Sequence, residues 1–288
     1  RDRSPSRGLG DVYKRQAVLN TETSIENHPG NAQTDSGSGE HSVIFEHVDF
    51  VYPDGEEAVL KDISFSAKSG ETVAFIGSTG SGKSSLIQLI PRFYDRASGN
   101  IYIDGQKIED LDINTLRSKI GFVPQKAHLF SGTIEENIRF GKPDATMDEI
   151  IHAAKIAQAY DFIMEKPHQF QEQIVEGATN VSGGQKQRLS IARALIRKPE
   201  IYIYDDSFSA LDFKTDARLR KALKPEIKNA IVFLVAQRVS TILDADKIVV
   251  LDEGKIAGIG THRELLASCP IYYEIAASQL SKEELTYA

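Results

Sequence analysis

Residues 71–90 read ETVAFIGSTGSGKSSLIQLI, and this stretch decides the fold. Its first part, ETVAFI, has the largely continuous apolar character of a strand that is buried on both faces of a sheet. A glycine-rich loop follows, and Leu86, Leu89 and Ile90 then recur at the spacing of a helix. A buried strand, a glycine-rich loop and a helix in this order predict an α/β domain with a parallel sheet.

The loop GSTGSGKS, Gly77–Ser84, fits the phosphate-binding pattern G-x-x-x-x-G-K-S. Its glycines let backbone N–H groups face a phosphate, and the helix that follows adds positive potential at its N-terminus. Lys83 is expected to reach the outer phosphates, and Ser84 to ligate Mg²⁺. The alternative is a flexible Gly/Ser loop, which the flanking strand and helix disfavour. The candidate ATP-binding residues here are Gly77, Ser78, Thr79, Gly80, Ser81, Gly82, Lys83, Ser84 and Ser85.

Further strand-like runs surround this unit. VIFEHVDFVY (43–52) and VLKDISFSA (59–67) are joined by PDGEE, which contains turn residues, so the pair predicts an antiparallel edge sheet. Residues 133–198 show mostly helical patterns. Three more strand-like runs alternate with helical patterns, namely IYIY (201–204), AIVFLVA (230–236) and KIVVLD (247–252). The layout predicts a parallel-sheet core with an antiparallel β subdomain and an α-helical insertion.

Length and composition narrow the classes of function. The chain has 288 residues, 41% of them hydrophobic, which is enough for one large α/β domain or two small ones with a sizeable core. A formal net charge of −7 gives no basic field for binding nucleic acid. The single cysteine, Cys269, excludes an intramolecular disulfide. The longest apolar run, residues 230–236, is far shorter than the roughly 20 residues of a membrane-spanning helix, so we expect no direct membrane insertion by this segment.

The first residues of the chain have the sequence expected of a translated sequencing adapter. Residues 6–16, SRGLGDVYKRQ, match the translation of a transposase sequencing adapter, so we exclude residues 1–16 from fold reasoning. A basic N-terminal arm is the alternative. Residues 21–42 are polar and lack periodicity, which is typical of a linker. We therefore expect the natural gene to continue upstream of Ala17.

The stretch VSGGQKQRLSIARAL, residues 181–195, carries the strongest family signal. Locally it predicts a helix that begins after an N-cap at Ser182 and directs Leu189, Ala192 and Leu195 into a core. The stretch also resembles the ABC signature motif, and on it the chain is identified as similar to the nucleotide-binding domains of exporter-type ABC transporters. The resemblance implies that this helix start contacts the γ-phosphate of ATP bound by a second domain, so that a dimer sandwiches ATP at two sites. The candidate residues are Ser182, Gly183, Gly184 and Gln185.

The resemblance assigns roles to further residues of this chain. Asp205 ends the strand-like run IYIYD, and the resemblance makes it a Mg²⁺ ligand together with Ser84 and Gln125. Tyr52 resembles the aromatic residue that stacks on adenine, although an ordinary strand tyrosine is the alternative. Gln125, in FVPQKAHLFSGTIEENI, also implies coupling of the site to transmembrane helices. Asp212 closes SALD, which matches the loop that crosses the dimer interface.

Two residues depart from the family pattern. The family places a catalytic Glu after the Mg²⁺ carboxylate and a switch His after the strand at 230–236, whereas this chain has Asp206 and Gln237. Asp and Glu differ by only about 0.4 in reference pKa, but the shorter side chain withdraws the carboxylate by roughly 1.5 Å. A misplacement of about 1 Å can lower a rate on the order of a hundredfold. Gln237 cannot become cationic. The candidate catalytic residues are Asp206, Gln237 and Gln125, in a site that we expect to turn over slowly.

An intact SGGQ beside altered hydrolytic residues resembles one half of a heterodimeric exporter. Glu176 falls near the acidic segment that exporters place against their transmembrane domain, although Gly177 replaces the usual arginine. The resemblance therefore implies a second ABC half-transporter as partner and a position at the cytoplasmic face of the cell membrane. The expected domains are a linker from an absent transmembrane domain at 17–42, the ABC ATPase domain at 43–278 with a helical subdomain at about 127–198, and a tail at 279–288.

Two alternatives of other classes remain open. A soluble ABC ATPase that acts on DNA or ribosomes would need a second ABC domain, a coiled coil or a basic face, and the sequence offers none of these features. A nucleotide-sensing module would bind ATP but would not hydrolyse it, even with a partner. The sequence names neither the transported substrate nor the partner.

Overall fold

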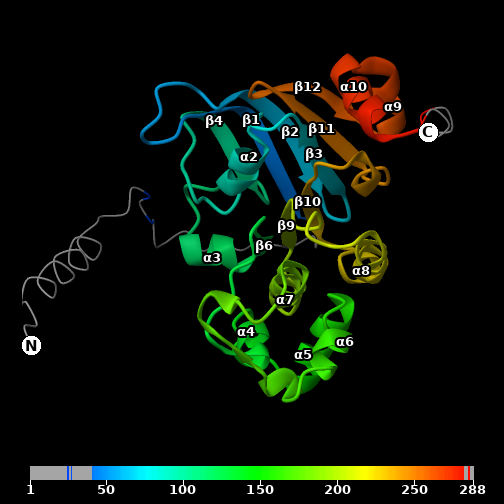
Figure 1. Ribbon diagram of the computed structural model, residues 1–288. Coiled ribbons are helices and arrows are strands. Elements are labelled where there is room, and N and C mark those ends of the chain that lie inside the picture. The colour runs from blue at the N-terminus through cyan, green and yellow to red at the C-terminus, as the bar shows by residue number, and fades with distance from the viewer. Residues whose placement is uncertain (1–24, 26, 28–40, 282–284, 286–288) are drawn as a thin grey trace, which may run out of the picture.

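The computed structural model describes residues 25, 27, 41–281 and 285. The stretch 1–16, which we attribute to an adapter, and nearly all of the expected linker lie outside the described residues. Within the described part, no helix is both long and apolar enough to cross a membrane. Figure 1 shows the larger sheets in the upper part of the molecule and a group of helices below them.

The central sheet has six strands and carries the glycine-rich loop. In spatial order the strands are β12 (Lys255–Gly260), β11 (Lys247–Asp252), β3 (Thr72–Gly77), β10 (Ile231–Val235), β9 (Ile201–Asp205) and β6 (Ile120–Val123). The strands from β11 to β6 run parallel to one another, and β12 pairs antiparallel with β11. The predicted α/β fold with a parallel core is therefore confirmed.

Side chains of the central strands alternate between two hydrophobic cores. In β3, Val73 and Phe75 lie in one core and Ala74 and Ile76 lie in the other, and all four side chains are buried. A period of two with both faces buried explains why the strand reads as a continuous apolar run. At the carboxyl end of β3 the chain enters the glycine-rich loop, and the predicted helix follows as α2 (Lys83–Leu89).

A second sheet of four strands shares one core with α2 and the central sheet. Its order is β2 (Leu60–Lys68), β1 (Ser42–Phe50), β4 (Ser98–Ile103) and β5 (Gln106–Lys107), and its pairs are antiparallel. The rings of Phe45 and Phe65 stack across β1 and β2 with 4.6 Å between centroids. The predicted antiparallel edge sheet is confirmed, and β4 and β5 extend it beyond the predicted pair.

A helical region lies between β6 and β9. It contains α4 (Ile134–Arg139), α5 (Met147–Ile156), α6 (Tyr160–Met164), α7 (Gly183–Leu195), the turns η1 (Gln169–Gln171) and η2 (Glu176–Ala178), and a small ribbon of β7 (Gly132–Thr133) and β8 (Gln173–Ile174). Capping boxes begin α4, α5 and α7 at Thr133, Thr146 and Ser182, so local sequence sets where these helices start.

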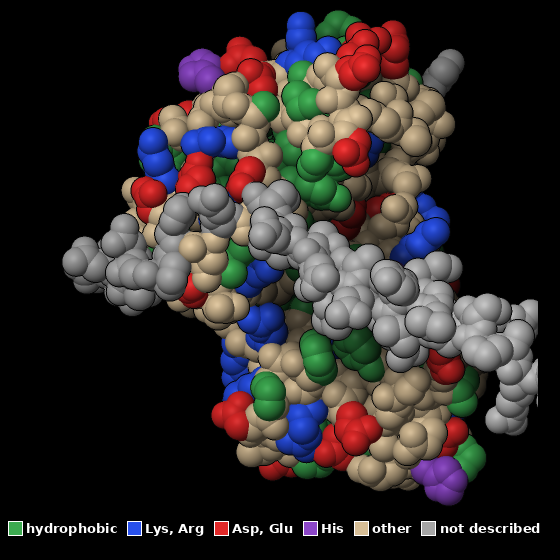
Figure 2. All heavy atoms as spheres, turned by 90° about the vertical axis from the view of Figure 1, so that its left-hand side faces the viewer, with side chains coloured by type: hydrophobic (Ala, Val, Ile, Leu, Met, Phe, Trp, Pro, Cys, Tyr) green, Lys and Arg blue, Asp and Glu red, His purple; other side chains and the backbone are tan. Residues whose placement is uncertain are grey.

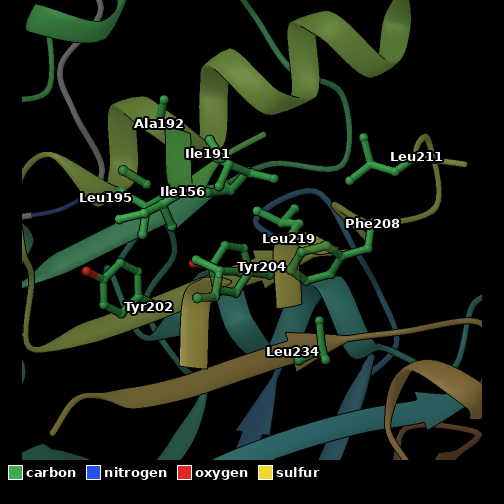
Figure 3. Close-up of a cluster of buried hydrophobic side chains, with 14 of the residues drawn as sticks. Ile156, Ile191, Ala192, Leu195, Tyr202, Tyr204, Phe208, Leu211, Leu219 and Leu234 are labelled. Atoms are coloured by element: carbon green, nitrogen blue, oxygen red, sulfur yellow. The ribbon is translucent and has the colours of Figure 1, made fainter. Parts of the chain in front are cut away.

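Buried side chains join this helical region to the central sheet. Figure 3 shows Tyr202 and Tyr204 of β9 in one cluster with Ile191 and Leu195 of α7, and all four residues are buried. The two tyrosine rings are nearly parallel, with 6.1 Å between their centroids. This shared cluster of buried side chains connects the helix of the signature stretch to the strand that ends at the carboxylates.

The remaining helices flank the sheets. They are α3 (Ile113–Ser118), α8 (Phe213–Glu226), α9 (His262–Ser268) and α10 (Pro270–Gln279), with the turn η3 (Val239–Thr241) after β10. In Figure 1, α9 and α10 lie together beside β12. Figure 2 shows acidic and basic side chains interspersed over the upper half of one face, so this part of the surface carries both signs of charge.

Candidate functional site

The glycine-rich loop needs glycine for space and for backbone conformation. Gly77 and Gly82 have positive φ angles of 154° and 98°. A Cβ at Gly77 would lie 2.0 Å from the carbonyl oxygen of Leu251, and a Cβ at Gly82 would lie 2.6 Å from a leucine side chain. Gly80 also has positive φ, but a Cβ there would meet no atom within 4 Å. The tip of the loop, Ser78–Gly80, is exposed, so its backbone is open to a ligand.

Lys83 lies over the loop, and Ser84 faces a carboxylate. Lys83 Nζ donates to the carbonyl oxygen of Gly77 over 2.9 Å. Burial lowers the pKa of Lys83, and the charges of Asp206 and Asp205 oppose this shift. Ser84 Oγ donates to Asp205 Oδ1 over 2.9 Å, although 121 residues separate the two in sequence. An ammonium, a hydroxyl and a carboxylate therefore meet at the carboxyl ends of β3 and β9.

Two glutamine amides hold the side chain of Asp206. Gln237 Nε2 donates to Asp206 Oδ2 over 2.7 Å, and Gln125 Nε2 donates to the same oxygen over 3.2 Å. Asp206 has a positive φ of 46°, which is uncommon outside glycine. Its carbonyl oxygen accepts a hydrogen bond from Ser209 Oγ over 2.8 Å, which helps to hold this conformation. The three residues that we named as catalytic thus meet at one carboxylate.

The two neighbouring carboxyl groups at the end of β9 share a charged, buried environment. Burial raises the pKa of Asp205, against the hydrogen bond from Ser84. Burial also raises the pKa of Asp206, against hydrogen bonds that include those from Ser209 and Gln125. Two adjacent buried carboxylates repel each other, so a cation beside them would be stabilised electrostatically.

Tyr52 and Ser85 contact each other beside α2. Tyr52 follows the end of β1 by two residues, and its hydroxyl oxygen lies 2.8 Å from Ser85 Oγ. Its ring packs edge-on against Phe50 and Tyr94, with centroids 4.7 and 5.1 Å away. Ser85 is buried, and its contact is with Tyr52 rather than with the exposed tip of the loop. These contacts hold the Tyr52 ring next to the start of the loop helix.

The signature stretch forms the exposed start of α7, with Ser182 as its N-cap as predicted. Ser182 Oγ accepts from the backbone N–H of Gln185, and Gln185 Oε1 accepts from the backbone N–H of Ser182. Ser182 and Gly183 are exposed, and a Cβ at Gly183 would meet no atom within 4 Å among the described residues beyond its chain neighbours and its own helix. At Gly184 a Cβ would lie 3.2 Å from the carbonyl oxygen of Ala210. Among the described residues, no hydrogen bond joins this stretch to the glycine-rich loop.

Asp212 and Glu176 are also exposed. Asp212 is the N-cap of α8, because its Oδ1 accepts from the backbone N–H of Thr215 over 3.0 Å. The next residue, Phe213, is 73% exposed, which leaves a large apolar side chain uncovered beside the cap. Glu176 begins η2, in which Gly177 has a φ of 71° that favours glycine over arginine.

Sequence reasoning missed the bonds that hold the segment around Gln125. Gln187 of α7 is buried, and its Nε2 donates to the carbonyl oxygen of Pro124 over 3.0 Å. Ser207 Oγ donates to the carbonyl oxygen of Val123 over 2.8 Å. These two bonds tie Gln125 to the signature helix and to the segment that carries the carboxylates. Gln187 lies off the helix face that the sequence predicted to be buried, so the pattern gave no signal for this contact.

Comparison with known proteins agrees with this arrangement. A family model described as ABC transporter matches residues 60–209, which is more than half of the 288 residues. The chain is 47% identical over 241 residues to the "Uncharacterized ABC transporter ATP-binding protein YfiB" of Bacillus subtilis, with 84% of this chain and 42% of that protein covered. It is 48% identical over 237 residues to a "Putative multidrug export ATP-binding/permease protein" of Staphylococcus aureus strain Mu50, with 82% of this chain and 41% of that protein covered.

A solved structure has the same fold. The "Structure of a bacterial Atm1-family ABC exporter with ATP bound" matches with a TM-score of 0.86 and 35% identity, and covers 96% of this chain and 48% of that chain. The chain therefore spans less than half the length of each of these relatives. On the family model, the two relatives and the shared fold together, the chain belongs to the ABC transporter family.

Proposed function

We propose that the chain is the ATP-binding and ATP-hydrolysing domain of an ABC exporter. The observation that carries the proposal is the hydrogen bond from Ser84 to Asp205. Beside it, the ammonium group of Lys83 binds the backbone of the loop. The printed name of the Staphylococcus aureus relative includes multidrug export, and the solved structure is of an exporter with ATP bound. These names favour export over action on DNA or ribosomes.

The residues of the site suit ATP with Mg²⁺. The open backbone of the loop and the ammonium of Lys83 would bind the phosphates, and the ring of Tyr52 would face the base. The hydroxyl of Ser84, the carboxylate of Asp205 and the amide oxygen of Gln125 are hard oxygen donors of the kind that Mg²⁺ prefers. When bound, Mg²⁺ would neutralise charge that develops on the phosphates.

Asp206 is the residue of this chain that would orient the attacking water. Its Oδ2 atom accepts hydrogen bonds from both glutamine amides. Burial favours the neutral carboxyl, whereas the bonds from Gln125 and Gln237 favour the carboxylate that such a role requires. Gln237 cannot add a positive charge as the phosphates become more negative. We therefore propose that this site hydrolyses ATP slowly.

The exposed start of α7 suits contact with a second domain. Ser182 presents its hydroxyl and Gly183 its backbone N–H at a helix N-terminus, which favours an anion. We propose that this start and the nearby Asp212 complete the ATP site of a second ABC half-transporter. Because the signature is intact and the hydrolytic residues are altered, the pair would be a heterodimer. Its transmembrane domains would move substrate out of the cytosol, with this chain at the cytoplasmic face of the cell membrane.

The proposal is tested by titrating MgATP into the full chain and into a Lys83→Ala variant. Loss of a charge-assisted hydrogen bond is worth about 1.5–3 kcal/mol, so the affinity for ATP should fall by roughly ten- to a hundredfold. Lys255→Ala on β12 is the matched control, since Lys255 is exposed and lies on the edge strand of the central sheet. Equal ATP affinity in the Lys83→Ala variant and the unsubstituted chain would refute the assignment of the loop.

A further inference from the structure

Side chains from two helices bind the backbone of the segment that carries Gln237. Arg220 of α8 donates from Nη1 to the carbonyl oxygens of Ser240 and Thr241 over 3.3 and 3.1 Å. Gln279, the last residue of α10, binds the same segment closer to β10. Because the chain leaves the sheet after β10, these side chains supply partners that a neighbouring strand would otherwise provide.

Gln279 uses both ends of its side-chain amide. Its Nε2 donates to the carbonyl oxygen of Gln237 over 2.9 Å, and its Oε1 accepts from the backbone N–H of Val239 over 2.8 Å. One planar amide thus fixes two backbone points on either side of Arg238. The side chain of Gln237 departs from the backbone at one of these points and ends on Asp206 Oδ2, 2.7 Å away. The position of the Gln237 amide therefore depends on where Gln279 holds its backbone.

The helix that carries Gln279 is itself well anchored. Tyr272 and Ala276 of α10 are fully buried, and the hydroxyl of Tyr272 lies 2.7 Å from Nδ1 of His262 on α9. Figure 1 shows the two helices packed together at the edge of the molecule beside β12. Ala276 precedes Gln279 by one helical turn, so the end of α10 has a defined position against the core.

We propose that Gln279 is a positioning residue that holds the Gln237 amide against Asp206, so that the C-terminal helix α10 helps to build the hydrolytic site. Its consequence for ATP turnover rests on the proposed function, whereas the contacts themselves involve only this chain. An open cavity of about 440 Å³ is lined by both Gln237 and Gln279. Solvent therefore reaches this contact, and loss of the Gln279 amide should expose the Val239 N–H to exchange.

The test is amide hydrogen exchange and NMR spectroscopy on the full chain. Gln279→Met keeps the length of the side chain and removes its donor and acceptor, so the Val239 amide should exchange about fivefold faster. The side-chain amide resonances of Gln237 should also move in this variant. Gln279→Glu keeps an acceptor for the Val239 N–H but places a carboxylate oxygen against the Gln237 carbonyl, so it should also move the Gln237 resonances, with a smaller rise in Val239 exchange than Gln279→Met. Ser278→Ala, one residue away on the same helix, is the control and should change neither signal, since among the described residues Ser278 Oγ donates only to the carbonyl oxygen of Ile275 in α10.

Three outcomes would overturn the proposal. They are unchanged Val239 exchange in Gln279→Met, unchanged Gln237 side-chain resonances in that variant, and faster exchange spread evenly through α9, α10 and the segment after β10. The last result would assign Gln279 a role in general stability only. Failure of the unsubstituted chain to bind MgATP would instead refute the proposed function, and it would leave the exchange result standing.

Discussion

Restoring the two family residues at the hydrolytic site should raise ATP turnover. The perturbation is Asp206→Glu together with Gln237→His in the full chain. Asp206 Oδ2 is 2.7 Å from Gln237 Nε2 and 3.2 Å from Gln125 Nε2, so the carboxylate is drawn toward the two glutamines. Lengthening the side chain by one methylene moves the carboxylate outward by roughly 1.5 Å. The histidine replaces an amide that cannot carry charge with a group that can accept a proton.

The expected gain follows from the reach of the carboxylate. A misplacement of about 1 Å costs on the order of a hundredfold in rate, and part of that cost should remain because the surroundings are built for aspartate. We expect a gain of at least about tenfold in kcat, which is about 1.4 kcal/mol of activation free energy. The two side chains touch in this structure, so their effects should be non-additive and neither single substitution need suffice.

The assay is steady-state ATP hydrolysis at increasing concentrations of the chain, since a second copy would supply an intact signature stretch to the site. Adding Lys83→Ala to the doubly substituted chain should remove the gain, which assigns the turnover to this site. Asp148→Glu, at an exposed position on α5, controls for the extra methylene. The expected effects of side-chain length at residue 206 and of charge at residue 237 would be refuted by either of two results. One is no gain in turnover in the double variant, and the other is an unsubstituted chain that already hydrolyses ATP as fast as the double variant.

Three further predictions concern other parts of the chain. Gly183→Ala should leave the melting temperature unchanged, because an added Cβ meets no atom within 4 Å, and should slow turnover through contact with a second domain; unchanged turnover would contradict this contact. Burial raises the pKa of Asp104, but hydrogen bonds that include the one from Lys119 outweigh burial and leave that pKa below its usual value. A carboxyl whose pKa is lowered by folding stabilises the folded state at pH values above its unfolded pKa, and this stability is lost as the pH falls through its folded pKa. Asp104→Asn should therefore lower the free energy of unfolding at neutral pH by about 1 kcal/mol. Melting curves at several pH values should also show a smaller loss of stability in acid for this variant than for the unsubstituted chain. Tyr204→Phe should raise the free energy of unfolding by about 1 kcal/mol in urea titrations, because the buried hydroxyl of Tyr204 finds no partner among the described residues; a loss of stability would count against this.

The strands that could be predicted are the antiparallel pair β1 and β2 and, except for the short strand β6, the parallel strands buried on both faces. The strands β3, β9, β10 and β11 are continuous apolar runs, and each appears where the pattern indicated it. The strand β12 is an edge strand whose residues are all exposed or half-buried, so its sequence lacks that pattern. The strand β4 begins with Ser98 and Gly99, which are typical of turns, and its pairing with β1 defines it instead. Tertiary pairing outweighs local propensity in both cases.

In the site, too, local sequence predicted some features and only the fold determined others. The loop motif placed Lys83 and Ser84 together because they are adjacent in sequence. That Gln125 and Gln237 bind one oxygen of Asp206 could not be predicted, because they lie 81 and 31 residues from it and meet only when β6, β9 and β10 align. The contact of Gln279 had no sequence signal either, since a glutamine at a helix end is an ordinary surface residue. The family resemblance therefore predicted the roles of these residues, whereas their contacts with one another are known only from the structure.

The central claim is that this chain binds MgATP through the loop after β3 and the carboxylate at the end of β9. The most direct measurement is a crystal structure of the full chain with Mg²⁺ and a non-hydrolysable ATP analogue. We expect the phosphates to lie on the backbone of Gly77–Ser84 with Lys83 beside them, and Mg²⁺ to contact Ser84 and to lie next to Asp205. An analogue bound elsewhere, or phosphates that do not contact this loop, would contradict the account.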